Sequence, residues 1–397
     1  MSEHHEIPLL NDHHNHTSFY MVLRNCLDVR NIDDIDIAIK KIKELNDEIN
    51  VVLGWRFGNT GREEIEKLNP TLICDGSLHN YILNRKAKKM LKDKFPEIVS
   101  NIENLDWIEH NLCTITKFIP QIKTIEEKDV VEFFKFMLKE NQIYSMEDLL
   151  LPNIDFVKMY ENTGFSKRIK YWVDIKSYDK LSDEYRSNVE GFKIFLDGAI
   201  GPETAALNGY INTKSNGGLK LYSDDTLTKD LKFAAKESKP VAVHAIGELV
   251  IEQLVDIVER ENIKLPCLRI EHAQYISLDV AKRCKRLGIV LSMQINFSGE
   301  SLLFKHILTE EYLKRNNPFR MLIDECSFAP GKDLIFGSDG MPHGAQAALE
   351  NALFPVYESQ KLTLDEFIKG YCVDSYDHGK ISFDIENKKI INLKTMI

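Results

Sequence analysis

The sequence predicts an α/β protein with a TIM-like (β/α)8 barrel. From about residue 142 onward, short apolar runs alternate with helical segments, which implies parallel strands and right-handed crossovers. One further apolar run near the start brings the number of strands to eight, the number of a closed barrel. The eight runs are Ile7–Asn11, Ile143–Leu151, Arg168–Ile175, Phe192–Leu196, Val241–Ala245, Cys267–Ile270, Ile289–Met293 and Leu334–Phe336.

The first run leads into a histidine-rich motif, Asn11-Asp12-His13-His14-Asn15-His16-Thr17. Alternate residues of a strand face the same way, about 7 Å apart, so His14 and His16 can converge. Two imidazoles at a strand end form half of a metal site suited to zinc. The competing interpretation is a solvated His-rich terminus, because four of the first fourteen residues are His.

A long insertion separates the first two barrel strands. Residues 48–141 are expected to leave the barrel at the carboxyl end of strand one and to form a cap over that face, within a barrel domain of residues 1–375. Helices are predicted around residues 31–46, 80–93 and 126–140, and residues 95–120 show weak periodicity and are expected to be irregular.

Composition limits the partners. With 397 residues, 43% of them hydrophobic, the chain has enough apolar residues for a substantial core. A net charge of −10 argues against nucleic acid or an anionic membrane as the main partner and favours a small-molecule substrate. No apolar run approaches the roughly 18 residues of a membrane span. Seven scattered cysteines without a Cys-x-x-Cys motif fit reduced thiols, so a cytoplasmic location is expected.

Four further residues stand at or near the predicted carboxyl ends of other strands: Lys193, His244, His272 and Asp339. Taken singly, a His at a strand end is more often structural, and an Asp before Gly is more often a turn residue. Lys193 is less ordinary, because an ammonium within Phe-Lys-Ile-Phe is costly to bury. Together with His14 and His16 these residues share the face on which barrel enzymes perform chemistry, and this coincidence favours a metal centre.

These motifs resemble the amidohydrolase superfamily, and the local sequence is similar to its amidohydrolase-3 branch, which includes N-substituted formamide deformylases. The similar stretches are DGSLHNYILN (75–84), FKIFLDGAIGPETAAL (192–207), VHAIG (243–247), RIEHAQ (269–274) and FGSDGMP (336–342). Any one of these motifs is weakly specific, whereas five in order are strongly specific.

The resemblance implies two divalent metal ions, expected to be zinc. His14, His16 and Asp339 would bind one ion, His244 and His272 the other, and a carboxylated Lys193 would bridge them. The ions would activate a water, and Asp339 would act as the catalytic residue that moves its proton. The implied function is hydrolysis of a C–N bond in an amide, formamide or cyclic amide. Substrate contacts are expected from Trp55, His79, Asn84 and Gln294.

The chain departs from most members of this superfamily at its ends. Only about a dozen residues precede the His pair, so the small β-sandwich is expected to be reduced or absent. Residues 376–397 are expected to form a hairpin that lacks the usual partner strands, and its open edge is a candidate surface for a homodimer.

Two alternative functions remain open at this point. The motif around Asp12 also resembles the first motif of phosphoesterases of the polymerase-and-histidinol-phosphatase type. The expected absence of the sandwich strands suggests a second alternative, a metal-binding protein without catalytic activity.

Overall fold

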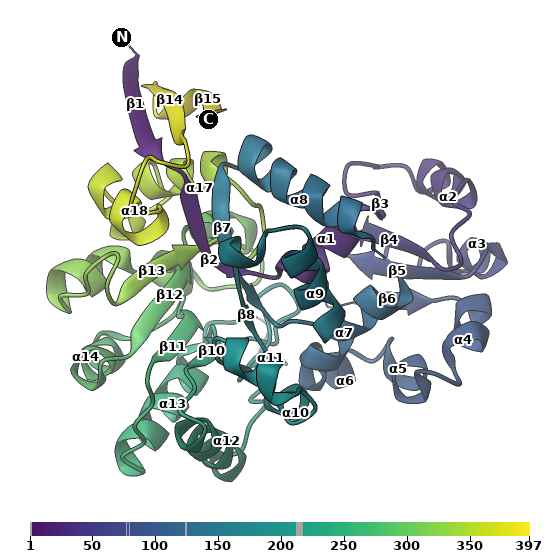
Figure 1. Cartoon of the computed structure of the whole chain (residues 1–397), viewed down its shortest axis with the longest axis horizontal. Coiled ribbons are helices and arrows are strands. Elements are labelled where there is room, and N and C mark those ends of the chain that lie inside the picture. The colour runs from purple at the N-terminus through teal and green to yellow at the C-terminus, as the bar shows by residue number, and fades with distance from the viewer. Residues whose placement is uncertain (1, 77, 79, 124, 212–216) are drawn as a thin grey trace. The chain divides into compact units, whose positions relative to one another are not determined.

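Among the described residues, eight strands form two sheets in which all neighbouring strands are parallel, and these strands alternate with helices along the chain (Figure 1). In this computed structural model, residues 2–76, 78, 80–123, 125–211 and 217–397 are described. Two parallel sheets have the orders β2-β7-β8 and β9-β10-β11-β12-β13. The strands are β2 (Leu10–Asn15), β7 (Ile143–Leu149), β8 (Ile169–Trp172), β9 (Phe192–Phe195), β10 (Val241–Ala245), β11 (Leu268–His272), β12 (Val290–Gln294) and β13 (Leu334–Gly337). This is the TIM-like α/β arrangement that the alternation of runs predicted.

The two parallel sheets meet on both sides. A parallel bridge between Val173 and Phe192 connects the end of β8 to β9. On the other side, Gly337 of β13 lies so close to β2 that an added Cβ atom would fall 2.3 Å from the backbone nitrogen of His14. Only a residue without a side chain fits this approach of β13 to β2.

Helices connect successive strands, and Figure 1 shows α12, α13 and α14 along one side of β10–β12. Side-chain caps mark several helix starts: Ser223 accepts a hydrogen bond from Thr226 N, and Thr363 forms a capping box with Glu366. The helices are α8 (Glu127–Glu140), α9 (Ile154–Asn162), α10 (Ile175–Tyr178), α11 (Asp183–Asn188), α12 (Asp224–Lys236), α13 (Glu248–Arg260), α14 (Leu278–Leu287), α15 (Glu300–Leu303), α16 (Glu310–Arg315), α17 (Ala345–Leu353) and α18 (Leu364–Tyr371).

The first predicted strand is two strands in the structure. β1 (Glu3–Pro8) and β2 are separated by Leu9 alone, and they belong to different sheets. Pro8, which has no backbone N–H to donate, ends β1, after which the chain joins the parallel sheet through Leu10 N and the carbonyl of Gln142.

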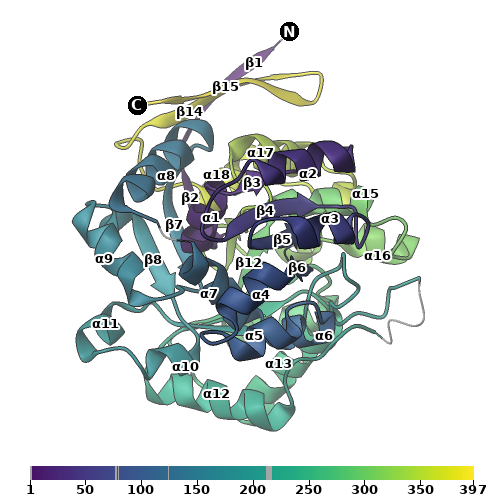
Figure 2. The same ribbon diagram turned by 90° about the vertical axis from the view of Figure 1, so that its right-hand side faces the viewer.

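The predicted C-terminal hairpin is present as β14 (Lys380–Glu386) and β15 (Lys389–Met396). Asn387 and Lys388 between them have φ values of 51° and 59°, as in a type I′ turn. The expectation that the hairpin lacks a partner strand is wrong. β1 pairs antiparallel with β14, so the three strands form a sheet of order β1-β14-β15, which Figures 1 and 2 show beside both chain ends.

The chain divides into two compact units. Unit 1 comprises Met1–Thr17 and Glu127–Ile397, and unit 2 comprises Ser18–Glu126. The cap expected at residues 48–141 overlaps unit 2, and its position over the strand ends stays a prediction. Helix α1 (Thr17–Arg24) begins at the junction.

Unit 2 has a four-stranded sheet of order β3-β4-β5-β6, in which only the β5–β6 pair is antiparallel. Its hydrophobic core includes the buried residues Val29, Val52, Trp55, Ile65 and Ile73. Its elements are β3 (Leu27–Asp28), β4 (Asn50–Trp55), β5 (Thr71–Asp75), β6 (Tyr81–Leu83), α2 (Ile35–Lys43), α3 (Arg62–Lys67), α4 (Arg85–Leu91), α5 (Pro96–Asn101), α6 (Leu105–His110) and α7 (Leu112–Ile122).

The expectation of an irregular segment at 95–120 is wrong, because α5, α6 and α7 occupy it. Helices α5 and α6 have six residues each, too few for a 3.6-residue periodicity to be visible. Local signals define them instead: Pro96 is the first residue of α5, and Asn104 caps α6 by accepting from Trp107 N. Within the described part of the chain, no helix is long and apolar enough to cross a membrane.

Candidate metal centre

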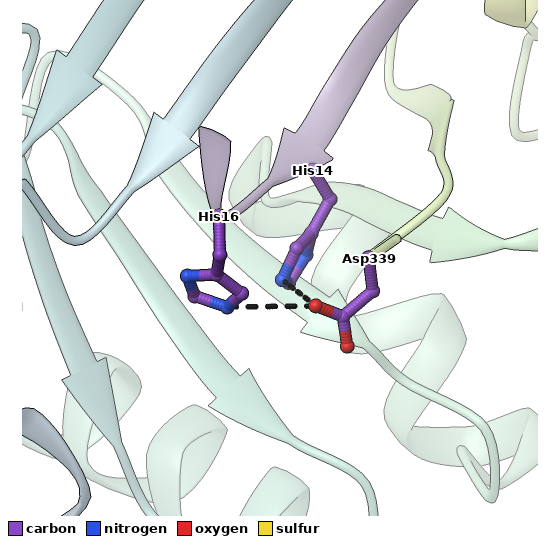
Figure 3. A group of neighbouring side chains, drawn as sticks. All are labelled: His14, His16 and Asp339. Carbon is purple, nitrogen blue, oxygen red and sulfur yellow. Dashed lines mark ion pairs between the residues drawn. The ribbon is translucent and has the colours of Figure 1, made fainter. Parts of the chain in front are cut away.

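Three of the predicted ligands converge at the carboxyl ends of β2 and β13. Asp339 Oδ1 lies 3.6 Å from His14 Nε2 and 3.4 Å from His16 Nε2 (Figure 3). One ligand atom from each of these residues lies within 4.8 Å of the others. His14 is fully buried, whereas the His16 and Asp339 side chains each keep 16% of their surface exposed. The cluster is therefore buried at His14 and accessible to solvent at His16 and Asp339.

Backbone contacts fix this convergence. The amide of Asp339 donates a 2.7 Å hydrogen bond to the carbonyl of His14. Asp339 has a φ of 53°, an uncommon conformation for a residue other than glycine, which turns the chain directly after β13. The loop that carries Asp339 is thus held against the strand that carries His14.

Asp12 reinforces the same contact from inside the fold. Its carboxylate accepts hydrogen bonds from Ser338 N (2.7 Å), Ser338 Oγ (2.6 Å) and Asn15 Nδ2 (2.8 Å). Burial raises the pKa of Asp12, against the opposing effect of these hydrogen bonds. Asp12, which lies in the histidine motif, therefore joins β2 to the Asp339 loop.

Three more predicted ligands lie on β11, β10 and β9 of the same sheet as β13. The ring centroid of His272, at the end of β11, is 4.8 Å from that of His14 and 4.4 Å from that of His244 on β10. In the sheet, Ala245 of β10 pairs with His272, and Ala242 pairs with Lys193 of β9. Lys193 is 2% exposed, and its Nζ lies 4.9 Å from the ring centroid of Phe195.

The electrostatics of this centre favour neutral imidazoles. Burial lowers the pKa of His14 and of His272 well below the usual value, and the charge of Lys193 adds to the effect. Burial and Lys193 together lower the pKa of His16 to about 3. A neutral imidazole is the form that binds a metal ion.

The residues fit a divalent ion. Among the described residues, the buried Nε2 of His14, which faces Asp339, has no hydrogen-bond partner, and neither has Nδ1 of the nearby His272. Two ligands at 2.0–2.1 Å from a tetrahedral ion are about 3.3–3.4 Å apart. The 3.4 and 3.6 Å separations around Asp339 Oδ1 are close to this spacing.

Comparison with known proteins identifies the family of the chain. The model of the amidohydrolase family matches residues 74–345, which is more than half of the chain. The chain belongs to the amidohydrolase family. The resemblance deduced from the five motifs is therefore confirmed.

Two curated relatives match over shorter stretches. The putative amidohydrolase YtcJ of Bacillus subtilis (strain 168) is 35% identical over 121 residues, 30% of this chain and 23% of the relative. The protein LONG AFTER FAR-RED 3 of Arabidopsis thaliana is 30% identical over 156 residues, 38% of this chain and 26% of the relative. These matches thus span about a quarter of the length of each relative.

Two solved structures have the same fold. An uncharacterized metal-dependent hydrolase from Pyrococcus furiosus has a TM-score of 0.70 at 20% identity, over 91% of this chain and 80% of the other. Its counterpart from Pyrococcus horikoshii has a TM-score of 0.69 at 21% identity, over 88% and 74%. At this identity the likeness supports the TIM-like fold of this amidohydrolase.

The predicted substrate-binding residues lie in different parts of the protein. Gln294 ends β12 in unit 1, is fully buried, and its Oε1 has no hydrogen-bond partner in the part of the chain that the structure describes. Trp55 packs in the core of unit 2 and donates from Nε1 to Gly58 O. Asn84 caps α4, accepts a hydrogen bond from Thr71 N through Oδ1 and donates from Nδ2 to Asn69 O. His79 lies outside the described residues.

Sequence reasoning missed a buried ionic network next to the ligands. Burial raises the pKa of Glu147, but the charge of Arg269 and the contact with His13 outweigh it and lower the pKa to about 2. Burial lowers the pKa of Arg269, but the charges of Glu147 and Glu271 outweigh this effect, and the pKa is raised. The signal that was available is the pair Arg269 and Glu271, opposite charges two residues apart at the carboxyl end of the predicted strand Cys267–Ile270.

Proposed function

We propose that this amidohydrolase is a metal-dependent enzyme that hydrolyses a C–N bond in an amide, formamide or cyclic amide of a small molecule. One observation carries the proposal: the convergence of His14 Nε2, His16 Nε2 and Asp339 Oδ1 at one pair of strand ends. We further propose that the eight parallel strands close into a barrel with this centre at its mouth and that residues 48–141 cap it. Ligand clusters at carboxyl strand ends are typical of barrel enzymes.

The residues would hold two divalent ions, which we propose to be zinc. His14, His16 and Asp339 would hold one ion, and His244 and His272 the other. When bound, the ions would lower the pKa of a water towards neutrality and polarise the substrate carbonyl.

Lys193 would bridge the two positions as a carbamate. The ammonium first loses one proton to solvent, and the neutral amine then adds to carbon dioxide: an N–C bond forms, one C=O π bond opens, and a second proton leaves to solvent. A cationic side chain thereby becomes an anionic one with two oxygens. The charge change suits the position, because an ammonium at Lys193 disfavours positive charge on all three neighbouring imidazoles.

Asp339 would act as the proton carrier. Its Oδ1 faces both imidazoles, and its side chain keeps 16% of its surface exposed. It would take a proton from the attacking water and deliver it to the leaving nitrogen, the two transfers that C–N hydrolysis requires.

Metal analysis and a substrate screen test the proposal together. The purified protein is expected to contain up to two zinc ions per chain and to hydrolyse members of a panel of N-acyl and N-formyl compounds. His14→Asn should lose both properties, whereas the exposed His306→Asn should keep them. Turnover of phosphate esters instead would favour the phosphoesterase alternative, and metal without any turnover would favour the silent metal-binding protein.

A further inference from the structure

The side chain of His14 makes a second contact on the side away from Asp339. Its Nδ1 lies 2.7 Å from Glu271 Oε2, and both side chains are fully buried. A carboxylate without a proton can only accept, so the shared hydrogen belongs to the imidazole. With Nδ1 as the donor, the lone pair of a neutral ring is at Nε2, the atom that faces Asp339.

Glu271 is itself held in place by Arg269. The guanidinium donates from Nε to Glu271 Oε1 at 2.8 Å, which leaves Oε2 for His14. The same guanidinium donates from Nη2 to the carbonyl of His13 at 2.7 Å, and this carbonyl belongs to the peptide bond that begins His14. Arg269 therefore restrains both the backbone and, through Glu271, the side chain of His14.

Arg269 is fixed by contacts on its remaining sides. Its Nη1 donates to Glu147 Oε2 on β7 at 2.6 Å, and its Nη2 also donates to Ser292 Oγ on β12 at 3.2 Å. The guanidinium carbon lies 4.9 Å from the ring centroid of Trp172, whose Nε1 donates to Glu147. Because buried charges are costly unless they are paired and hydrogen-bonded, a guanidinium bound to two carboxylates is constrained to one position.

We infer that Glu271, oriented by Arg269, is a positioning residue that keeps His14 in the Nδ1–H tautomer with Nε2 directed to the metal. The inference rests on the proposed function for the metal and on the observed contacts for the tautomer. When a ligand His donates its other ring N–H to a carboxylate, substitution of that carboxylate commonly weakens metal binding 10- to 100-fold.

The protein offers a matched pair of variants for the test. Glu271→Gln and Glu147→Gln each remove one buried negative charge from Arg269, but only Glu271 contacts a predicted ligand. In Glu271→Gln, the amide group cannot accept from both Arg269 and His14 with the strength of a carboxylate. Zinc titration calorimetry on the chelator-stripped full chain should therefore show at least about tenfold weaker binding for Glu271→Gln and less than about threefold for Glu147→Gln.

A second measurement needs no change in the network. Imidazole 15N chemical shifts of the metal-free protein, with His14 assigned by comparison with His14→Gln, should show the Nδ1–H tautomer for His14. Equal losses of zinc affinity in the two variants, unchanged affinity in Glu271→Gln, or an Nε2–H tautomer in the wild-type protein would each overturn the inference. A wild-type chain that takes up no zinc would instead contradict the proposed function, and the 15N spectrum would then decide the tautomer by itself.

Discussion

The backbone amide of Asp339 donates a 2.7 Å hydrogen bond to the carbonyl oxygen of His14. This single bond joins the loop after β13 to β2, the strand that carries His14 and leads into His16. It also brings two predicted ligands from distant parts of the sequence to one place. The position of Asp339 relative to His14 therefore depends on how closely β13 and β2 approach each other.

Gly337→Ala tests this dependence. An added Cβ atom would lie 2.3 Å from His14 N and 2.6 Å from His14 Cβ, so the two strands must separate. Overpacking of this kind typically costs about 1–3 kcal/mol, and we expect a lower melting temperature together with reduced zinc content by mass spectrometry. Gly76→Ala is the control, because no atom of a described residue other than its chain neighbours lies within 4 Å of its added Cβ atom. Full zinc content in Gly337→Ala would show that the centre tolerates a wider spacing.

Asp12→Ala should weaken the contact between β2 and the loop that carries Asp339. The substitution leaves Ser338 N and Asn15 Nδ2 without their buried acceptor, and each unsatisfied group costs about 1–3 kcal/mol. Urea denaturation should show a lower free energy of unfolding than for Asp155→Ala, which changes a mostly exposed carboxylate. Equal stabilities of the two variants would contradict the importance of the Asp12 contacts.

Lys193→Ala should lose metal and activity together. The variant has no amine that can form the proposed carbamate, so added bicarbonate should not restore it. Short-chain carboxylic acids are expected to restore part of the activity by occupying the bridging position. Lys220→Ala, at an exposed position, serves as the control. A Lys193→Ala protein with two zinc ions and normal turnover would make the residue structural.

The ionised Glu147 side chain is expected to contribute to the free energy of unfolding, and acid should remove this contribution. The groups that face it are Arg269 on β11, His13 on β2, and Trp172 with the more distant Lys170 on β8. The folded-state pKa is about 2, below the model-peptide value of 4.5, so the unfolded chain binds the proton more tightly. The contribution, up to about 3 kcal/mol, is present above pH 4.5 and is lost as the pH falls towards 2.

Urea unfolding at pH 7, 5, 4 and 3 measures this contribution. The wild-type free energy of unfolding should fall more steeply with acid below pH 4.5 than that of Glu147→Gln. Parallel pH profiles for the two proteins would contradict the assignment of this effect to Glu147.

The strands and the candidate ligands could be predicted from the sequence because both depend on local signals. An apolar run with a polar residue after it identifies a strand and its end, and this pattern located His244, His272 and Asp339. The break at Leu9 was not visible, because one apolar run, Ile7–Leu10, continues through two strands of different sheets. Its cause is the pairing of β1 with β14, which no local pattern reveals.

The ionic network could not be predicted for the same reason. Glu147, Arg269 and His13 come from three different strands, and each of them alone resembles an ordinary polar residue. The helices between residues 95 and 120 were missed because they are short and are defined by caps. The roles of Trp55 and Asn84 in unit 2 depend on packing and capping that periodicity does not encode.

The order in which the chain leaves the ribosome matters for the candidate centre. β2 is made first, but its partners β7 and β13 and the Asp339 loop are made much later. Until Asp339 has been synthesised, His14 of β2 and His16 directly after it lack the carboxylate that completes their cluster. Nascent chains that end before Asp339 therefore cannot assemble the cluster, so the cluster forms late in the folding of this protein.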